Sequence, residues 1–333
     1  MNTVRLKDIA DKTGFSISTV SRILSGDTNR KMKEETISLV LQTADAMGYY
    51  KTKNQKLRKA LPTVRMLAIF QEESEASNTL TLGILDGIRK EVIELSPHMR
   101  LEYDTISTND SNFRDRLSRA KVDAAVIVGR IDEETIEFIS SHIGYILYSG
   151  LDGLSGHDEI ICDAREGIRK GVSFLSLKGR KRIAYIGPSE RNGYPYLGYL
   201  EGLADSHIER DQNLVENADS NTLNGYEAAM HLLGRTTPDA IVTASDSIAL
   251  GVMRAMKEMG IRCPETTALI GFGNQESSAY LDPSLSSFEV PKKELGQFAV
   301  RIAIDRIENP RKGCIRVTLP YTFIERESTG KNI

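Results

Sequence analysis

The sequence predicts a small all-α N-terminal domain followed by an α/β core of two doubly wound parallel-sheet subdomains. Two short amphipathic helix patterns flank Gly14, and strand and helix patterns alternate after Pro62. The chain has 333 residues, more than one hydrophobic core usually serves, so several domains are expected. We therefore divide it into a headpiece (residues 1–50), a connector (residues 51–62) and a core (residues 63–333).

The headpiece begins with two helices that a tight turn joins. A first apolar stripe with the spacing i, i+3, i+4 consists of Leu6, Ile9 and Ala10. Gly14 suits a turn with a positive φ, and Ser16 can cap a second helix over residues 17–24. The inward face of that second helix carries Val20, Ile23 and Leu24. The pattern is that of a helix-turn-helix.

The outward face of the second helix has side chains suited to DNA, namely Ile17, Ser18, Thr19, Ser21 and Arg22. Hydroxyls can bind phosphates, Arg22 can donate two hydrogen bonds to a guanine, and Ile17 can contact a thymine methyl. Residues 1–60 hold twelve Lys or Arg and six Asp or Glu, so they carry a net charge of +6, whereas the rest carries −9. An ordinary helical hairpin would not explain this basic head on an acidic body, so double-stranded DNA is the expected partner.

A third helix is expected over residues 34–47, and the connector after it is strongly basic. Two interpretations of the connector stay open. It can be a flexible linker. It can also be a hinge helix that orders on DNA and inserts Leu57 into the minor groove. In that case the phosphates are held by Lys53, Lys56 and Arg58.

In the core, strands and helices alternate in two rounds. The first round opens with a strand at residues 65–70 and a helix at residues 81–95, and the second opens with a strand at residues 181–187. This order implies parallel sheets with helices on both faces. Ligands of such folds bind at the carboxyl ends of the strands, so we expect a ligand cleft between the subdomains.

Enzyme motifs are missing from the sequence. The first strand runs into the acidic stretch QEESEASN, which would repel a pyrophosphate, and Gly271-Phe272-Gly273 has Glu276 in place of a third glycine. There is no P-loop, G-x-S-x-G or H-E-x-x-H motif, no histidine pair at i, i+4 and no C-x-x-C. We expect no catalytic residue, no metal site, no cofactor and three buried, reduced thiols.

The sequence has no run of about 18 apolar residues and no apolar segment near Met1. We therefore expect no membrane association and a cytoplasmic location.

Several stretches resemble the LacI/GalR family of bacterial transcriptional repressors over nearly the full length. They are RLKDIADKTGFSISTVSRILSG, GRKRIAYIG, TASDSIALGVMRAMKEMGIRCPETTALIGF, LSSFEVPKKELGQFA and ERESTG. The resemblance implies a core like periplasmic sugar-binding proteins, a homodimer, a palindromic DNA operator and a small-molecule effector, a sugar such as a galactoside. It also implies that the last strands cross back. One subdomain would then hold residues 63–160 with 291–320, and the other residues 161–290 with 321–333.

The resemblance also implies roles for single residues in DNA binding. The family's recognition-helix positions are occupied by Ser16, Ile17, Ser18, Thr19, Ser21 and Arg22. Ile17, Ser18 and Arg22 would contact bases, the other hydroxyls mainly phosphates, and Leu57 the minor groove. The hinge departs from the family pattern, because Lys51 stands where proline is common and Leu57 comes one place early.

The effector pocket departs further from the family pattern. Ser149 replaces an acid after the fourth core strand, Pro195 a sugar-gripping arginine, Ser245 an asparagine and Gly273 an acid. The candidate effector contacts are Glu72, Ser149, Arg191, Tyr196, Ser245, Asp246 and Asn274. Asp246 is also expected to cap the helix that follows it.

Other function classes fit the sequence less well. A periplasmic-type sugar receptor would not need the basic head and would need a signal peptide. A Rossmann-like enzyme would need the missing glycine motif. A DNA-binding regulator that responds to a non-sugar metabolite or to a protein co-regulator stays open.

Overall fold

The structure is a computed structural model. It describes residues 4–25, positions 36, 37, 39, 40, 43, 44, 47 and 49, and residues 63–71, 75–96, 100–154, 156–189 and 194–330. For residue 25 and residues 75–78 the backbone alone is described. The chain divides into two compact units, Met1–Thr63 with Glu94–Leu101 and Val64–Ile93 with Glu102–Ile333.

The predicted helix-turn-helix is present as α1 (Leu6–Thr13) and α2 (Ile17–Ser25). The Asp8 carboxylate accepts the Arg5 N–H at 2.6 Å and so stabilises the start of α1. Gly14 ends α1 with a φ of 75°, the left-handed conformation that glycine adopts without steric cost. The Ser16 Oγ accepts the Thr19 N–H at 3.2 Å, which confirms the predicted cap of α2.

The headpiece has a small apolar core of its own. Its buried members in the described part of the chain are Ile9, Ala10, Val20, Val40, Ala44 and Tyr49. Positions 36, 37, 39, 40, 43 and 44 are helical, in agreement with a third helix in this region. Burying this stripe of α2 leaves the opposite face of the helix for solvent or DNA.

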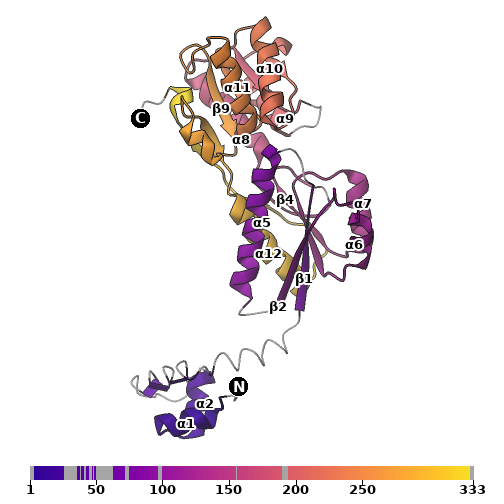
Figure 1. The fold of residues 1–333 in the computed structure, drawn as a ribbon, viewed down its shortest axis with the longest axis vertical. Helices are drawn as coiled ribbons and strands as arrows, with labels where there is room; N and C mark the ends of the chain where they lie inside the picture. Colours follow the sequence, from indigo (N-terminus) through magenta and orange to yellow (C-terminus); the bar gives the residue numbers. More distant parts are fainter. Residues whose placement is uncertain are drawn as a thin grey trace. The chain divides into compact units, whose positions relative to one another are not determined.

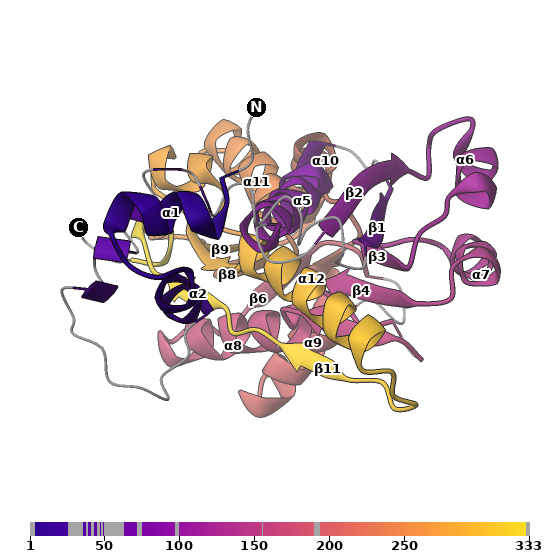
Figure 2. The ribbon, with the colours of Figure 1, turned by 90° about the horizontal axis from the view of Figure 1, so that it is seen from below.

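Within the residues described, the core holds two six-stranded sheets (Figure 1). The first has the order β11-β5-β4-β3-β1-β2. Its strands are β1 (Thr63–Phe70), β2 (Arg100–Ser107), β3 (Ala124–Val128), β4 (Ile146–Gly150), β5 (Asp158–Ile161) and β11 (Arg316–Thr318). Its helices are α5 (Glu75–Leu95), α6 (Phe113–Arg119), α7 (Glu133–His142) and α12 (Lys292–Glu308). α5 and α12 cover one face, and α6 and α7 cover the other (Figures 1 and 2).

The second sheet has the order β12-β10-β9-β8-β6-β7. Its strands are β6 (Ile183–Ile186), β7 (Val215–Glu216), β8 (Ala240–Thr243), β9 (Ala268–Phe272), β10 (Ser286–Glu289) and β12 (Thr322–Ile324). Its helices are α8 (Ala164–Leu177), α9 (Tyr194–Asp205), α10 (Thr222–Arg235) and α11 (Asp246–Glu258). Short 3₁₀ turns are η1 (Gln212–Leu214), η2 (Glu276–Tyr280) and η3 (Glu327–Thr329). Only β10–β12, of the strand pairs with described register, is antiparallel.

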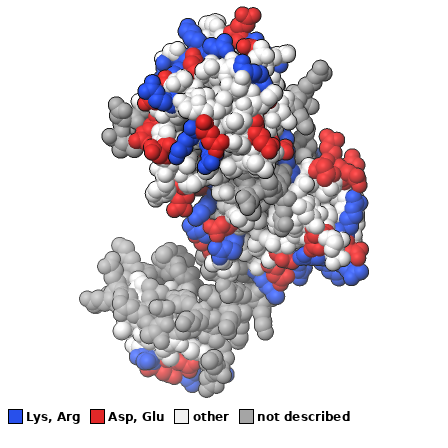
Figure 3. Space-filling view, turned by 45° about the horizontal axis from the view of Figure 1, so that its top comes forward, with Lys and Arg blue, Asp and Glu red and all other residues white. Residues whose placement is uncertain are grey.

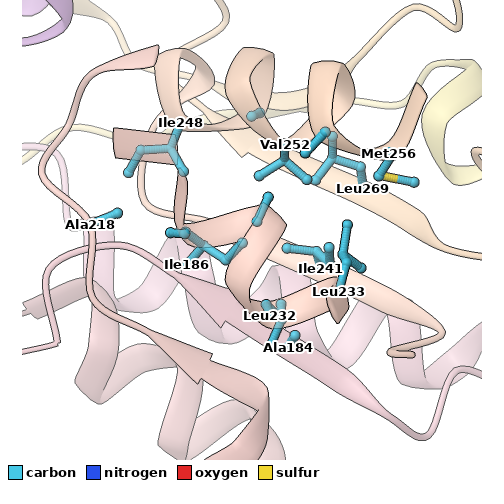
Figure 4. Packing of buried hydrophobic residues seen from close by; sticks show 14 of the residues in the cluster. Ala184, Ile186, Ala218, Leu232, Leu233, Ile241, Ile248, Val252, Met256 and Leu269 are labelled. Carbon is cyan, nitrogen blue, oxygen red and sulfur yellow. The ribbon is translucent and has the colours of Figure 1, made fainter. Parts of the chain in front are cut away.

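Buried aliphatic side chains join the strands of the second sheet to its helices. Ile241 and Leu269 from β8 and β9 meet Leu232 of α10 and Val252 of α11 (Figure 4). Each of these four side chains is fully buried. The alternating strand and helix patterns of the sequence therefore produce the predicted α/β fold class.

The chain leaves the second sheet after β10 and returns to the first. There α12 packs against β3, β4 and β5, and β11 pairs with β5 in parallel. The chain then goes back, and β12 pairs with β10. Residues far apart in sequence therefore share each sheet.

Candidate DNA-binding and effector sites

Hydroxyl groups gather at the N-terminus of α2. The Ser16 Oγ lies 2.8 Å from the Ser18 Oγ and 2.9 Å from the Thr19 Oγ1. This end of the helix carries partial positive charge from the peptide dipoles. Hydroxyl donors at a helix N-terminus form an anion-binding arrangement, which a DNA phosphate can occupy.

The exposed face of α2 continues along the helix from this cluster. Ile17 is 48% exposed, and Ser18 and Arg22 are also exposed. Ser18 and Arg22 are four residues apart, so they lie on one side of the helix. Thr19 and Ser21 are partly exposed at the edges of this face. The structure therefore brings together all six predicted contacts of the headpiece.

Six predicted site residues lie outside the described part of the chain. Four belong to the connector and are Lys53, Lys56, Leu57 and Arg58. The other two are the effector candidates Glu72 and Arg191.

Ser149 is the effector candidate at the carboxyl end of β4. Its side chain is fully buried, and its Oγ has no hydrogen-bond partner among the residues that the structure describes. A buried polar atom without a partner lowers the stability of the folded protein, and a ligand that hydrogen-bonds to the Ser149 hydroxyl would remove this cost.

Asp246 is fully buried at the start of α11 and is bound by groups of its own chain. Its carboxylate accepts hydrogen bonds from the Gln275 N–H at 2.7 Å, the Ser278 Oγ at 2.7 Å and the Ser287 Oγ at 2.5 Å. Burial raises the pKa of Asp246, and these hydrogen bonds oppose that shift. Asp246 therefore joins α11 to β10 and to the loop after β9.

The prediction that Asp246 caps α11 was wrong. Ser245 is the cap, because its Oγ accepts the Ile248 N–H at 3.3 Å and its backbone is extended. Asp246 is the first residue of the helix, and its side chain turns into the core. Both residue types are good caps, so the sequence could not distinguish them.

Asn274 lies in the loop after β9 with a φ of 42°, which is rare for a residue other than glycine. Its Oδ1 accepts a hydrogen bond from the Arg326 Nη2 at 2.8 Å. Arg326 also donates to the Leu285 carbonyl at 2.6 Å. Sequence reasoning missed Arg326 as a partner of the candidate site, although the stretch ERESTG drew attention to it.

Tyr196 is almost fully buried inside the second subdomain. Its ring centroid lies 5.5 Å from that of Tyr185 and 6.1 Å from that of Tyr199, and the Arg210 guanidinium lies 5.9 Å from it. The side chain thus packs within an aromatic cluster and supports the shape of α9 against β6.

The prediction of three buried thiols was wrong, because Cys162 is buried but Cys263 is only partly buried and Cys314 is exposed.

The remaining surface features of the described residues are a groove and mixed surface charge. One surface groove, of about 710 Å³, lies between α10 and α11 and contains none of the predicted contacts. Acidic and basic side chains are interspersed on the core face in Figure 3. No group of three metal-ligating side chains and no helix able to span a membrane occurs in the part of the chain that is described.

Two family models match separate parts of the chain. Residues 5–51 match the bacterial regulatory proteins of the lacI family, and residues 172–329 match the periplasmic binding protein-like domain. In both of these parts the chain is similar to LacI-family transcriptional regulators. Named relatives of the chain are transcriptional regulators of this family.

Similar proteins cover the chain almost completely. The HTH-type transcriptional repressor MelR of Bacillus subtilis is 28% identical over 98% of both chains. The HTH-type transcriptional regulator GalR of Streptococcus thermophilus is 28% identical over 92% of this chain and 94% of its own.

Solved structures share the fold. A complex of the transcriptional regulator CelR with cellobiose has a TM-score of 0.70 at 22% identity, over 98% of this chain and 99% of its own. A lac repressor dimer bound to operator and the anti-inducer ONPF has a TM-score of 0.68 at 21% identity, with the same coverage.

Proposed function

We propose that the chain is a homodimeric repressor that binds a palindromic operator and whose affinity for DNA is controlled by a sugar such as a galactoside. The observation that carries the proposal is the exposed face of α2. There, hydroxyls gather at the helix N-terminus and Arg22 lies on the side of Ser18. Such a protein acts on chromosomal DNA, so its place is the cytoplasm.

Similar proteins support the nature of the effector. The CelR structure contains cellobiose, and a further LacI-family structure contains ribose. Within the family, the stretches YKT and ASDSIA resemble the Ebg-type repressor of the evolved β-galactosidase operon. We infer a galactoside on this resemblance.

Control of DNA affinity requires that the effector bind one arrangement of the core better than another. Ser149, Ser245 and Asn274 are the contacts we propose at the strand ends, with Glu72 and Arg191 as further candidates. Asp246 and Tyr196 would not contact the effector. Asp246 would position the loop after β9, and Tyr196 would position helix α9. In the connector, Lys53, Lys56 and Arg58 would contact phosphates, and Leu57 would enter the minor groove.

A second candidate is the same regulator with a non-sugar metabolite or a protein co-regulator as its effector. The residues that favour it are Ser149, Ser245 and Gly273, which stand where sugar-responsive members of the family carry acidic or amide side chains.

The test is a selection of duplexes from random DNA with the full chain, followed by gel shifts on the selected duplex. We expect a palindrome, and we expect a galactoside to change the affinity of the protein for it. Failure to enrich any sequence would overturn the regulator proposal. A selected operator whose binding responds to other metabolites, but to no sugar, would favour the second candidate.

A further inference from the structure

The N-terminus of α12 gathers groups that attract an anion. Lys292 is the first residue of this 17-residue helix, and Pro291 at the cap position provides no side-chain hydrogen bond. The peptide dipoles place partial positive charge at the same end. A ligand atom with negative charge would therefore be stabilised here.

Lys292 is partly buried, and its charge is not neutralised by a contact. Asp246 and Glu289 are the carboxylates whose charge reaches its ammonium group, and no hydrogen bond or ion pair joins its side chain to any described residue. Burial lowers the pKa of Lys292. By contrast, the Nζ of its neighbour Lys293 is exposed and lies 3.5 Å from the Asp86 Oδ2.

The two nearby carboxylates are poor partners for Lys292. Both oxygens of Asp246 already accept hydrogen bonds, from Gln275, Ser278 and Ser287. Glu289 is exposed, so water solvates its charge. The ammonium group therefore keeps donors for a third partner.

Packing fixes the direction of the lysine stem. A Cβ placed on Gly83 of α5 would lie 2.8 Å from the Lys292 Cβ and 3.1 Å from its Cδ. A Cβ at position 83 would therefore clash with Lys292, and glycine at this position allows the Lys292 stem to pack directly on the backbone of α5. The ammonium group is therefore held near the start of α12.

The unpartnered hydroxyl of Ser149 is an independent observation, and it lies on the face of the first sheet that α12 covers. Ile146 and Tyr148 of β4 pack with Phe113 of α6 and Ile139 of α7. Side chains alternate along a strand, so Ser149 faces the opposite side, where α12 contacts β4. Its Oγ is buried and unpartnered among the described residues, which leaves one more donor on the face of the sheet that α12 covers.

We propose that the start of α12 binds a phosphoryl group of the effector, with the Lys292 Nζ, the N–H groups of Lys293 and Glu294 and the Ser149 hydroxyl as donors. The Lys292 N–H itself donates to the Val290 carbonyl. This inference rests on the proposed function and specifies its ligand as a phosphorylated sugar. Three kinds of donor suit an oxyanion better than the hydroxyls of a neutral sugar.

The test measures binding of inorganic phosphate to the full chain by calorimetry, with sodium chloride at equal ionic strength as the reference. We expect saturable phosphate binding that Lys292→Gln weakens at least about tenfold, since a charge-assisted hydrogen bond is lost. Ser149→Ala should also weaken it. Lys293→Gln is the matched control, because it removes the same charge from the next residue and should bind phosphate like the parent chain.

Two results would overturn the proposal. Phosphate binding that is absent, or equally affected by Lys292→Gln and Lys293→Gln, excludes a site at Lys292. Acetate that binds as tightly as phosphate would show that the site does not select a phosphoryl group. Gel shifts on the selected operator test the regulator proposal separately, because operator binding by the full chain does not depend on Lys292. A chain that binds the operator but not phosphate would overturn only the phosphate site.

Discussion

Partners that are distant in sequence decide what Asp246 and Asn274 do. Both were predicted to face a ligand. Asp246 instead accepts three hydrogen bonds from its own chain, and Asn274 receives one from Arg326, 52 residues away. Ser149 is different, because its hydroxyl is buried and has no partner in the part of the chain described. At the residue scale, Asp246 and Asn274 are therefore already hydrogen-bonded within the chain, whereas Ser149 has a hydroxyl donor available for a ligand.

DNA readout is tested by two neighbouring residues of α2. Arg22→Ala should cost about 1–3 kcal/mol per half-site and relax the preference at one base pair, because a bidentate contact to a base carries sequence information. Ser21→Ala should weaken all duplexes alike, because a phosphate contact carries none. Binding profiles over a library of single-base operator variants will check this. Identical profiles for the two variants would contradict these roles.

Asp158 predicts a pH dependence of core stability. Burial by itself raises the pKa of Asp158, but hydrogen bonds from Arg306, the Ile315 N–H and the Tyr145 hydroxyl together hold it below its ordinary value. A lowered pKa means that this stabilisation is complete above the unfolded-state value of 3.8 and is lost as the pH falls through the folded-state value.

Asp158→Ala should therefore cost about 3–5 kcal/mol at neutral pH, because Arg306 is left partly buried without its partner. Urea unfolding of both proteins across the acid range will measure the difference. The difference should shrink as the carboxylate is protonated. A cost that stays constant to the lowest pH at which the core is folded would contradict the assignment.

At the scale of elements, α5 and α12 pack with their backbones in close contact. A Cβ on Gly87 would lie 2.0 Å from the Lys293 carbonyl oxygen, and one on Gly296 would lie 2.1 Å from the Ile84 carbonyl oxygen. The sequence predicted α5 from residue 81, whereas the helix begins at Glu75. Its first turn, EASN, has no apolar stripe, so periodicity could not reveal it.

Gly87→Ala should push these two helices apart and cost about 1–3 kcal/mol or more, because a backbone carbonyl cannot move away as a flexible side chain can. Urea unfolding of the core checks this value. Gly144→Ala is the control, since no atom outside its chain neighbours lies within 4 Å of the added methyl group. Its effect should stay within about 0.5 kcal/mol. Equal effects of the two substitutions would refute the close packing.

At the scale of the whole molecule, the N-terminal residues are basic and the rest of the chain is acidic. Residues 1–60 carry +6 and the remainder carries −9. The basic part is therefore suited to DNA, and the acidic part limits non-specific binding by the core.

The proposed dimer should bind its operator with a steep salt dependence. If each subunit makes about four to five phosphate contacts, the logarithm of the binding constant should fall with the logarithm of salt concentration with a slope of about −7 to −9. Light scattering should give about twice the chain mass of 37.0 kDa. A slope near zero would contradict operator binding through phosphates, and four chain masses would contradict the dimer.

The sequence by itself determined the local elements and the fold class. Leu6, Ile9, Gly14 and Ser16 specify α1, the turn and the start of α2 through interactions that span only a few residues. The alternation of strand and helix patterns determined the parallel sheets, because each pattern lies within one element.

Only the tertiary structure decided which side chains meet at the strand ends. Arg306 reaches Asp158 across 148 positions, and Lys292 comes to lie over Gly83 because α12 returns to the first sheet. Ser245 and Asp246 are both good helix caps by type, and the burial of Asp246 among distant serines settled their roles. Such contacts follow from sheet order and chain crossing, and local sequence patterns carry little information on either.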